Sequence, residues 1–168
     1  MTEISNWTLE ELQEIDKQYM KAKDIEQEAL DFKNKKYNYD LCVRRSQEAF
    51  ELFLKVVFKL MRKKYPTNVK GHELSNQIVS IYEKLKVVLK NYYFPKEDLA
   101  RIIIGSKVLH LWRNISLYGE EKLEKIGISR IFTEKEAELA LDYLNKASQL
   151  CNLIRDYFYK VVASEEAN

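Results

Sequence analysis

Glycine, proline, cysteine and histidine are scarce in this chain of 168 residues, which contains 4 Gly, 2 Pro, 2 Cys and 2 His. A protein built from many short strands needs more of the residues that form tight turns. Cys42 and Cys151 fit neither a disulfide framework nor a Cys-x-x-Cys metal pair, so we expect both to pack in the core. Because the two histidines have no partners at ligand spacing, the sequence predicts no metal site and no cofactor.

Long hydrophobic runs are also absent. No stretch approaches the roughly 18 consecutive apolar residues of a membrane span, and residues 1–12 contain no apolar run of the kind found in signal peptides. The Gly-rich phosphate loop, the dinucleotide-binding fingerprint and the Gly-x-Ser-x-Gly nucleophile motif are missing as well. We therefore expect a cytoplasmic protein without a membrane partner, and the common enzyme classes that use these motifs are disfavoured.

The charged residues are unevenly distributed. The net charge is +2 overall, but it is −5 over residues 1–34, +9 over residues 35–96 and −2 over the rest. The middle third is therefore cationic, with Arg62, Lys63 and Lys64 at its centre. Such a patch raises the local concentration of phosphate groups by long-range attraction, although lysine-rich helix faces also serve simply to solvate a helix.

Apolar residues recur along the chain at the period of an amphipathic helix. Thr8 with Glu11, and Thr133 with Glu136, form the Thr-x-x-Glu pattern of a capping box, which marks the start of a helix. The helices predicted in this way cover, approximately, residues 9–32, 38–65, 72–89, 95–119 and 134–161.

Two of these boundaries depend on single residues. Because a residue before proline is pushed out of helical geometry, the second helix is expected to end at Tyr65, before Pro66. Gly119 is expected to end the fourth helix. We therefore predict one all-α domain, an up-and-down bundle of about five helices. Its parts are an acidic N-terminal helix, a core and a frayed tail, over residues 1–36, 37–160 and 164–168.

Three short patterns follow one another along the chain. Residues 46–55 read Ser-Gln-Glu-Ala-Phe-Glu-Leu-Phe-Leu-Lys, residues 71–74 read Gly-His-Glu-Leu, and residues 113–119 read Arg-Asn-Ile-Ser-Leu-Tyr-Gly. The first is similar to a Gln-x-Ala-x-Glu-x-x-x-Lys motif, the second to a His-Asp-Leu helix opening, and the third to an Arg-containing motif, all of the HEPN family (higher eukaryotes and prokaryotes nucleotide-binding). The chain thus resembles a HEPN domain over about residues 37–160.

The resemblance implies a helical bundle that forms homodimers. Many HEPN proteins are metal-independent ribonucleases, including toxins paired with nucleotidyltransferase antitoxins, while others bind RNA or nucleotides without cleaving them. In the ribonucleases, an arginine and a histidine a few residues later line a cleft at the dimer interface. Here Arg113 matches the arginine, but Tyr118 stands where the histidine is expected. The resemblance therefore implies phosphate binding and leaves catalysis open.

Cleavage of RNA without a metal requires a base for the 2′-hydroxyl, an acid for the leaving oxygen and a cation for the charge on the phosphorane. Arg113 is the candidate cation, because its planar guanidinium meets phosphate oxygens in pairs. His110 lies three residues earlier on the same side of the helix and can titrate near neutral pH, and Tyr118 can hydrogen-bond a phosphate. The structural alternatives are an interhelical brace for Arg113 and Asn114 and a packed or surface position for His110.

Taken together, these features predict a HEPN-like homodimer that binds RNA or a nucleotide with Arg113 and Asn114 in a cleft between subunits. The basic residues between positions 55 and 70, with Arg62, Lys63 and Lys64 at their centre, would steer the phosphates. Ribonuclease activity, as in a toxin–antitoxin component, is left open. The alternative is a noncatalytic helical interaction protein that partners a nucleotidyltransferase or another subunit.

Overall fold

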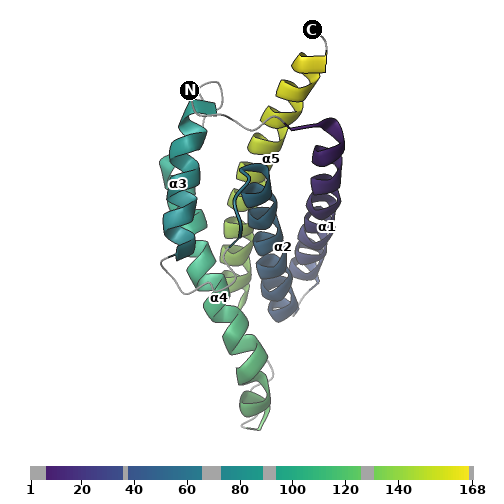
Figure 1. The fold of residues 1–168 in the computed structure, drawn as a ribbon. Helices are drawn as coiled ribbons and strands as arrows, with labels where there is room; N and C mark the ends of the chain where they lie inside the picture. The colour runs from purple at the N-terminus through teal and green to yellow at the C-terminus, as the bar shows by residue number, and fades with distance from the viewer. Residues whose placement is uncertain (1–6, 36–37, 66–72, 89–93, 126–130, 167–168) are drawn as a thin grey trace.

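The computed structural model of the protein describes residues 7–35, 38–65, 73–88, 94–125 and 131–166, and at 73–75, 87–88, 116–124 and 166 it describes the backbone only. Within these residues the chain forms five α-helices and no strand, as predicted (Figure 1). They are α1 (Leu9–Asn34), α2 (Tyr39–Leu60), α3 (Glu73–Val88), α4 (Lys96–Glu124) and α5 (Glu134–Glu166). None of these helices combines the length and the apolar character needed to cross a membrane.

Helices α1, α2 and α5 run side by side (Figure 1). Glu11 at the start of α1 reaches Arg62, just beyond the end of α2, so these two helices are antiparallel. Lys33 near the end of α1 reaches Glu134 at the start of α5, so α1 and α5 are antiparallel too. Helix α4 packs against α2 and α5, and α3 packs against α4. Covered by α1, α4 and α5, α2 is the central helix, and 11 of its 22 residues are buried.

The first helix begins where the sequence predicts. Thr8 Oγ1 accepts a hydrogen bond of 3.2 Å from the backbone N–H of Glu11, whose carboxylate accepts one of 3.0 Å from the backbone N–H of Thr8, so the capping box is complete. The predicted apolar stripe is buried at Leu12, Ile15, Ala22, Ile25 and Ala29. The acidic N-terminal helix is therefore packed into the bundle along its length.

A polar cluster joins α1 to α5. Arg155 donates two hydrogen bonds of 2.7 Å to Asp16, and the hydroxyl of Tyr159 donates a third of 2.6 Å to the same carboxylate. Burial alone would raise the pKa of Asp16, but the hydrogen bonds from Arg155 and Tyr159 more than offset it, so this pKa lies below its ordinary value. Burial and the bond to Asp16 raise the pKa of Tyr159 to about 12.

Both cysteines are buried free thiols, as predicted. Burial raises the pKa of Cys42 and of Cys151, so both stay protonated at neutral pH. Because the thiolate is the reactive form, neither residue is a candidate nucleophile.

The end of α2 differs from the prediction: the helix stops at Leu60 rather than at Tyr65. Arg62 adopts a left-handed conformation, with φ of 49°, which lets the N–H groups of Arg62 and Lys63 bond back to carbonyls of the last turn at 2.8 and 2.7 Å. This is a Schellman cap with arginine in the position that glycine usually takes. The Arg62 guanidinium lies 3.8 Å from the ring centre of Trp7, and this stacking offsets part of the backbone strain.

The end of α4 also differs from the prediction. The helix passes through Gly119 and ends at Glu124. A glycine inside a helix costs only about 1 kcal/mol relative to alanine, and strong helix formers follow Gly119 in the sequence, so the helix continues. As a result, the C-terminal end of α4 extends beyond the ends of α1 and α2 (Figure 1).

Helices α4 and α5 approach each other closely at Gly105. A Cβ atom added there would lie 2.8 Å from Cβ and Cγ of Tyr143, so the absence of a side chain permits the contact. Arg101, one turn earlier in α4, forms an ion pair of 2.6 Å with Asp142. These contacts fix the position of α4 on the bundle, and with it the position of Arg113.

Candidate functional site

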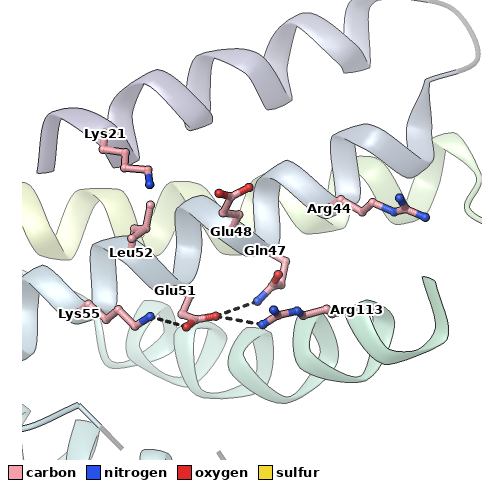
Figure 2. A pocket seen from close by; sticks show the side chains of 8 residues that line it. All are labelled: Lys21, Arg44, Gln47, Glu48, Glu51, Leu52, Lys55 and Arg113. Atoms are coloured by element: carbon pink, nitrogen blue, oxygen red, sulfur yellow. Dashed lines mark hydrogen bonds and ion pairs between the residues drawn. The ribbon is translucent and has the colours of Figure 1, made fainter. Parts of the chain in front are cut away.

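A shallow groove crosses the surface of α2 between α1 and α4 (Figure 2). We call it the α2 groove; its volume is about 340 Å³. Its lining residues are Lys21 from α1, Arg113 from α4 and, from α2, Arg44, Gln47, Glu48, Glu51, Leu52 and Lys55. It therefore brings together side chains that lie up to 92 positions apart in the sequence, from Lys21 to Arg113.

Three residues of the α2 groove lie on one face of α2 because they are spaced four residues apart: Gln47, Glu51 and Lys55. The Glu51 carboxylate accepts a hydrogen bond of 3.2 Å from Gln47 Nε2 and forms an ion pair of 2.7 Å with Lys55 Nζ. Arg113 reaches the same carboxylate from α4, with 3.5 Å between Nη1 and Oε2 (Figure 2). Two of the three sequence patterns that resemble HEPN motifs thus meet at Glu51.

Cationic groups outnumber carboxylates in the α2 groove. Four cations and two carboxylates line it, which gives the lining a net charge of +2. Glu48 forms an ion pair of 2.7 Å with Arg45, which is not part of the lining. Lys21 points toward α2, and its ammonium group has no hydrogen-bonding or ionic partner among the described residues (Figure 2). The groove is thus suited to an anionic ligand.

A second, much smaller hollow lies on the other side of Gln47 and Glu51. Its volume is about 20 Å³, enough for a water molecule but not for a phosphate group. His110 of α4 lines this hollow and is exposed to solvent. Its Nε2 lies 3.4 Å from Nδ2 of Asn114, one turn later. Glu51 therefore separates the α2 groove from the hollow that contains His110.

The structure places the predicted α4 residues on neighbouring turns. Arg113 is not sealed inside the protein: its side chain is 49% exposed, against 27% for Glu51. Asn114 is exposed as well and contacts His110 rather than the groove. Tyr118 falls in the last turns of α4, and its side chain lies outside the described part of the chain.

The basic triplet of the sequence does not line the α2 groove. Arg62 is held at the end of α2 by Trp7 and by Glu11, at 3.4 Å. Lys63 donates a hydrogen bond of 2.8 Å to Ser80 of α3, and burial, together with the nearby charge of Lys84, lowers its pKa. Lys64 is exposed. The triplet can attract an anion at long range, whereas Lys55, which belongs to the same predicted basic region, lines the groove itself.

Four residues that line the groove were not predicted from the sequence: Glu51, Gln47, Lys21 and Arg44. The signal for the first two was the four-residue spacing of Gln47, Glu51 and Lys55, which places them on one helix face. Lys21 carried no such signal, since only the packing of α1 on α2 brings it to the groove. Among the described residues, no group of three His, Cys, Asp or Glu side chains is placed to hold a metal ion.

The chemistry available in the α2 groove is that of anion recognition. The Arg113 guanidinium offers paired donors to phosphate oxygens, and Lys55 adds a point charge beside it. Lys55 Nζ also lies 5.5 Å from the ring centre of Tyr65, whose pKa is raised by burial and by Glu51, so this phenol stays protonated at neutral pH. Comparison with protein families, with curated proteins and with solved structures finds no match for this chain.

Proposed function

We propose that this protein binds the phosphate groups of RNA or of a nucleotide in the α2 groove, and that it does so as a HEPN-like homodimer. The observation that carries the proposal is the convergence of Arg113, Lys55 and Gln47 on one carboxylate in an open groove of net charge +2. These donors come from α2 and α4, two of the three helices that carry the HEPN-like patterns.

Phosphate binding fits the exposure and the chemistry of the groove. Arg113 is half-exposed and pairs with Glu51 at 3.5 Å, a long contact that leaves most of its donors available. Lys21 faces it from the other side of α2. An extended anion lying over α2 can therefore contact cations from two walls of the groove.

Self-association is supported by an exposed apolar stripe on α4. Ile104, Leu111 and Ile115 are 50%, 57% and 40% exposed, and Val108 between them is partly exposed. We call these four residues the α4 stripe. Their spacing of four, three and four residues reads the same from either end, so two copies packed antiparallel would place Ile104 opposite Ile115 and Val108 opposite Leu111. The same stripe supports the alternative, a helical interaction protein that docks a nucleotidyltransferase or another subunit.

For ribonuclease activity the candidate groups are His110 and Glu51, which line the small hollow, with the phosphate bound on the other side of Glu51, beside Arg113 in the α2 groove. An imidazole and a carboxylate beside a guanidinium supply an acid, a base and a cation, which are the groups that RNA cleavage without a metal requires. In this proposal 2′-oxygen attack on phosphorus breaks the bond to the 5′-oxygen, and the proton lost by the first oxygen is replaced on the second.

Binding of a fluorescently labelled single-stranded oligoribonucleotide, measured by anisotropy over a series of salt concentrations, tests the proposed function. We expect Arg113→Ala to weaken binding by at least about tenfold, since a hydrogen bond to a charged group contributes about 1.5–3 kcal/mol. The salt dependence should become shallower, by about 0.7 in the slope for each lost phosphate contact. The matched control is Arg101→Ala on the same helix, whose partner is Asp142.

Two results would count against phosphate binding: affinity that does not change with salt, or an Arg113→Ala variant that binds like the Arg101→Ala control. Incubating the same RNA with protein and EDTA reports cleavage in parallel. If the wild-type protein and the His110→Ala variant form products at equal rates, His110 takes no part in the proposed cleavage.

A further inference from the structure

Glu51 is an anion inside a groove that otherwise attracts anions. Its carboxylate lies 2.7 Å from Lys55 Nζ and 3.5 Å from Arg113 Nη1, and Gln47 donates to it as well. The side chain of Glu51 is less exposed than either cation that it contacts. It therefore occupies the position between Lys55 and Arg113 in which a phosphate group would sit.

The other cations of the α2 groove are placed elsewhere. Arg44 lies three turns before Lys55 on α2, and Lys21 reaches the groove from α1 (Figure 2). Residues 44–55 advance about 16 Å along the helix axis, which is longer than one phosphate group. The groove thus has a part already neutralised by Glu51 and a part in which Lys21 has no partner among the described residues.

We infer that the Glu51 carboxylate competes with the ligand for Lys55 and Arg113. The α2 groove therefore binds anions with two or more linked phosphate groups and discriminates against a single phosphate. The inference rests on the proposed function and names its ligand class. A single phosphate gains the contacts of Lys55 and Arg113 only by removing those of Glu51, and so gains little. A chain of phosphates makes the same exchange and adds a contact with Lys21.

Two kinds of molecule share this chemistry: the backbone of a single-stranded oligonucleotide and a linear polyphosphate. Both present regularly spaced negative charges that can follow α2. The net charge of +2 on the lining matches a ligand segment with two negative charges. The probes are therefore a labelled oligoribonucleotide, inorganic tripolyphosphate and inorganic phosphate.

The decisive variant is Glu51→Gln, which keeps the shape of the side chain and removes its charge. The matched control is Glu48→Gln, which makes the same change of net charge in the same groove, although Glu48 pairs with Arg45 instead of with Lys55 and Arg113. Any difference between the two variants reports the displacement of Glu51 rather than the overall charge. Circular dichroism of both variants checks that they remain folded.

For the wild-type protein we expect calorimetric titration to show tighter binding of tripolyphosphate than of inorganic phosphate at equal phosphate content. Glu51→Gln should bind tripolyphosphate and inorganic phosphate more tightly by roughly fivefold, the upper range for releasing an exposed ion pair, whereas Glu48→Gln should change by less than about twofold. With the labelled oligoribonucleotide, Glu51→Gln should also steepen the salt dependence, by about 0.7 in the slope for each cation released. A purely structural Glu51 would not move that slope.

The outcomes separate the two proposals. A wild-type protein that binds neither the oligoribonucleotide nor tripolyphosphate overturns the proposed function and this inference together. Binding that is equally strengthened by Glu51→Gln and Glu48→Gln, or inorganic phosphate that binds as well as tripolyphosphate, overturns the inference alone. If the oligoribonucleotide binds more tightly than tripolyphosphate at equal phosphate content, the ligand is a nucleic acid. The opposite order identifies a linear polyphosphate.

Discussion

The guanidinium of Arg113 lies 3.5 Å from the carboxylate of Glu51, and this contact joins α4 to α2 at the edge of the α2 groove. Both side chains remain accessible to water, so the attraction between them is weakened by the solvent. A pair of this kind adds little to folding and can be exchanged for a ligand at small cost. Arg113 is therefore better placed for binding than for bracing the bundle.

The first prediction concerns the stability of the Arg113→Ala variant. We expect the free energy of unfolding to fall by less than about 1 kcal/mol, because exposed ion pairs contribute about that much or less. Urea denaturation followed by circular dichroism measures it. Arg155→Ala is the contrast, since it removes two hydrogen bonds of 2.7 Å to Asp16 and should cost about 2–3 kcal/mol. Equal losses in the two variants would show that Arg113 is an interhelical brace.

The second prediction concerns pH. The pKa of Asp16 is lowered in the folded protein, so its ionised form stabilises the fold. This contribution is complete above the pKa of the unfolded chain, about 3.9, and is lost as the pH falls through the lower folded value. Denaturation at a series of pH values should show Asp16→Asn losing stability relative to the wild type at pH 6, with a smaller difference at about pH 2. A constant difference across that range would contradict the role of the charge.

The third prediction concerns the contact between α4 and α5. Gly105→Ala should destabilise the protein by about 1–3 kcal/mol, because the new Cβ would lie 2.8 Å from Tyr143 and the helices would have to move apart. Helix propensity alone predicts the opposite, a gain of about 1 kcal/mol. Ala100→Gly, at an exposed position of the same helix, calibrates the propensity term. A more stable Gly105→Ala variant would show that the two helices separate easily.

The fourth prediction concerns the α4 stripe. If it forms the homodimer interface, Leu111→Lys should shift the protein from dimer to monomer, because it places two charges in an apolar contact. Analytical ultracentrifugation over a range of concentrations measures the mass. Leu30→Lys is the control, since Leu30 is an exposed leucine of α1 outside the stripe. A wild-type protein that stays monomeric when concentrated, or a Leu111→Lys variant that remains dimeric, would argue for a different partner on this face.

The helices themselves could be predicted from the sequence because their signals are local. Thr8 and Glu11 are three residues apart, and the capping box they form depends on little else. The apolar stripe of α1 follows from one periodicity in the same way. The ends of α2 and α4 were predicted wrongly because local signals alone do not determine them. Gly119 is compatible with a helix as well as with its end, and Pro66 constrains only its neighbour, whereas α2 ends earlier through the left-handed Arg62.

The candidate site could be predicted only in part, for the same reason. Arg113 was identified from its own motif, but its partner Glu51 lies 62 positions earlier and becomes relevant only when α4 packs on α2. Lys21 reaches the groove only because α1 packs on α2. The basic triplet was conspicuous in the sequence, yet Arg62 and Lys63 are engaged by Trp7 and Ser80. A high density of charge along the sequence thus does not show which cations lie on the same surface of the folded protein.

The attachment of α1 has a consequence for how the molecule opens. The helix forms ion pairs with Arg62 near its start and with Arg155 in its first third, and Lys33 near its end contacts Glu134. Its apolar stripe is also buried from Leu12 to Ala29, so α1 should open only together with the rest of the bundle, and its amide hydrogens should exchange with solvent as slowly as those of α5. Because Lys21 belongs to α1, the α2 groove keeps its walls on α1 and α4 for as long as the protein remains folded.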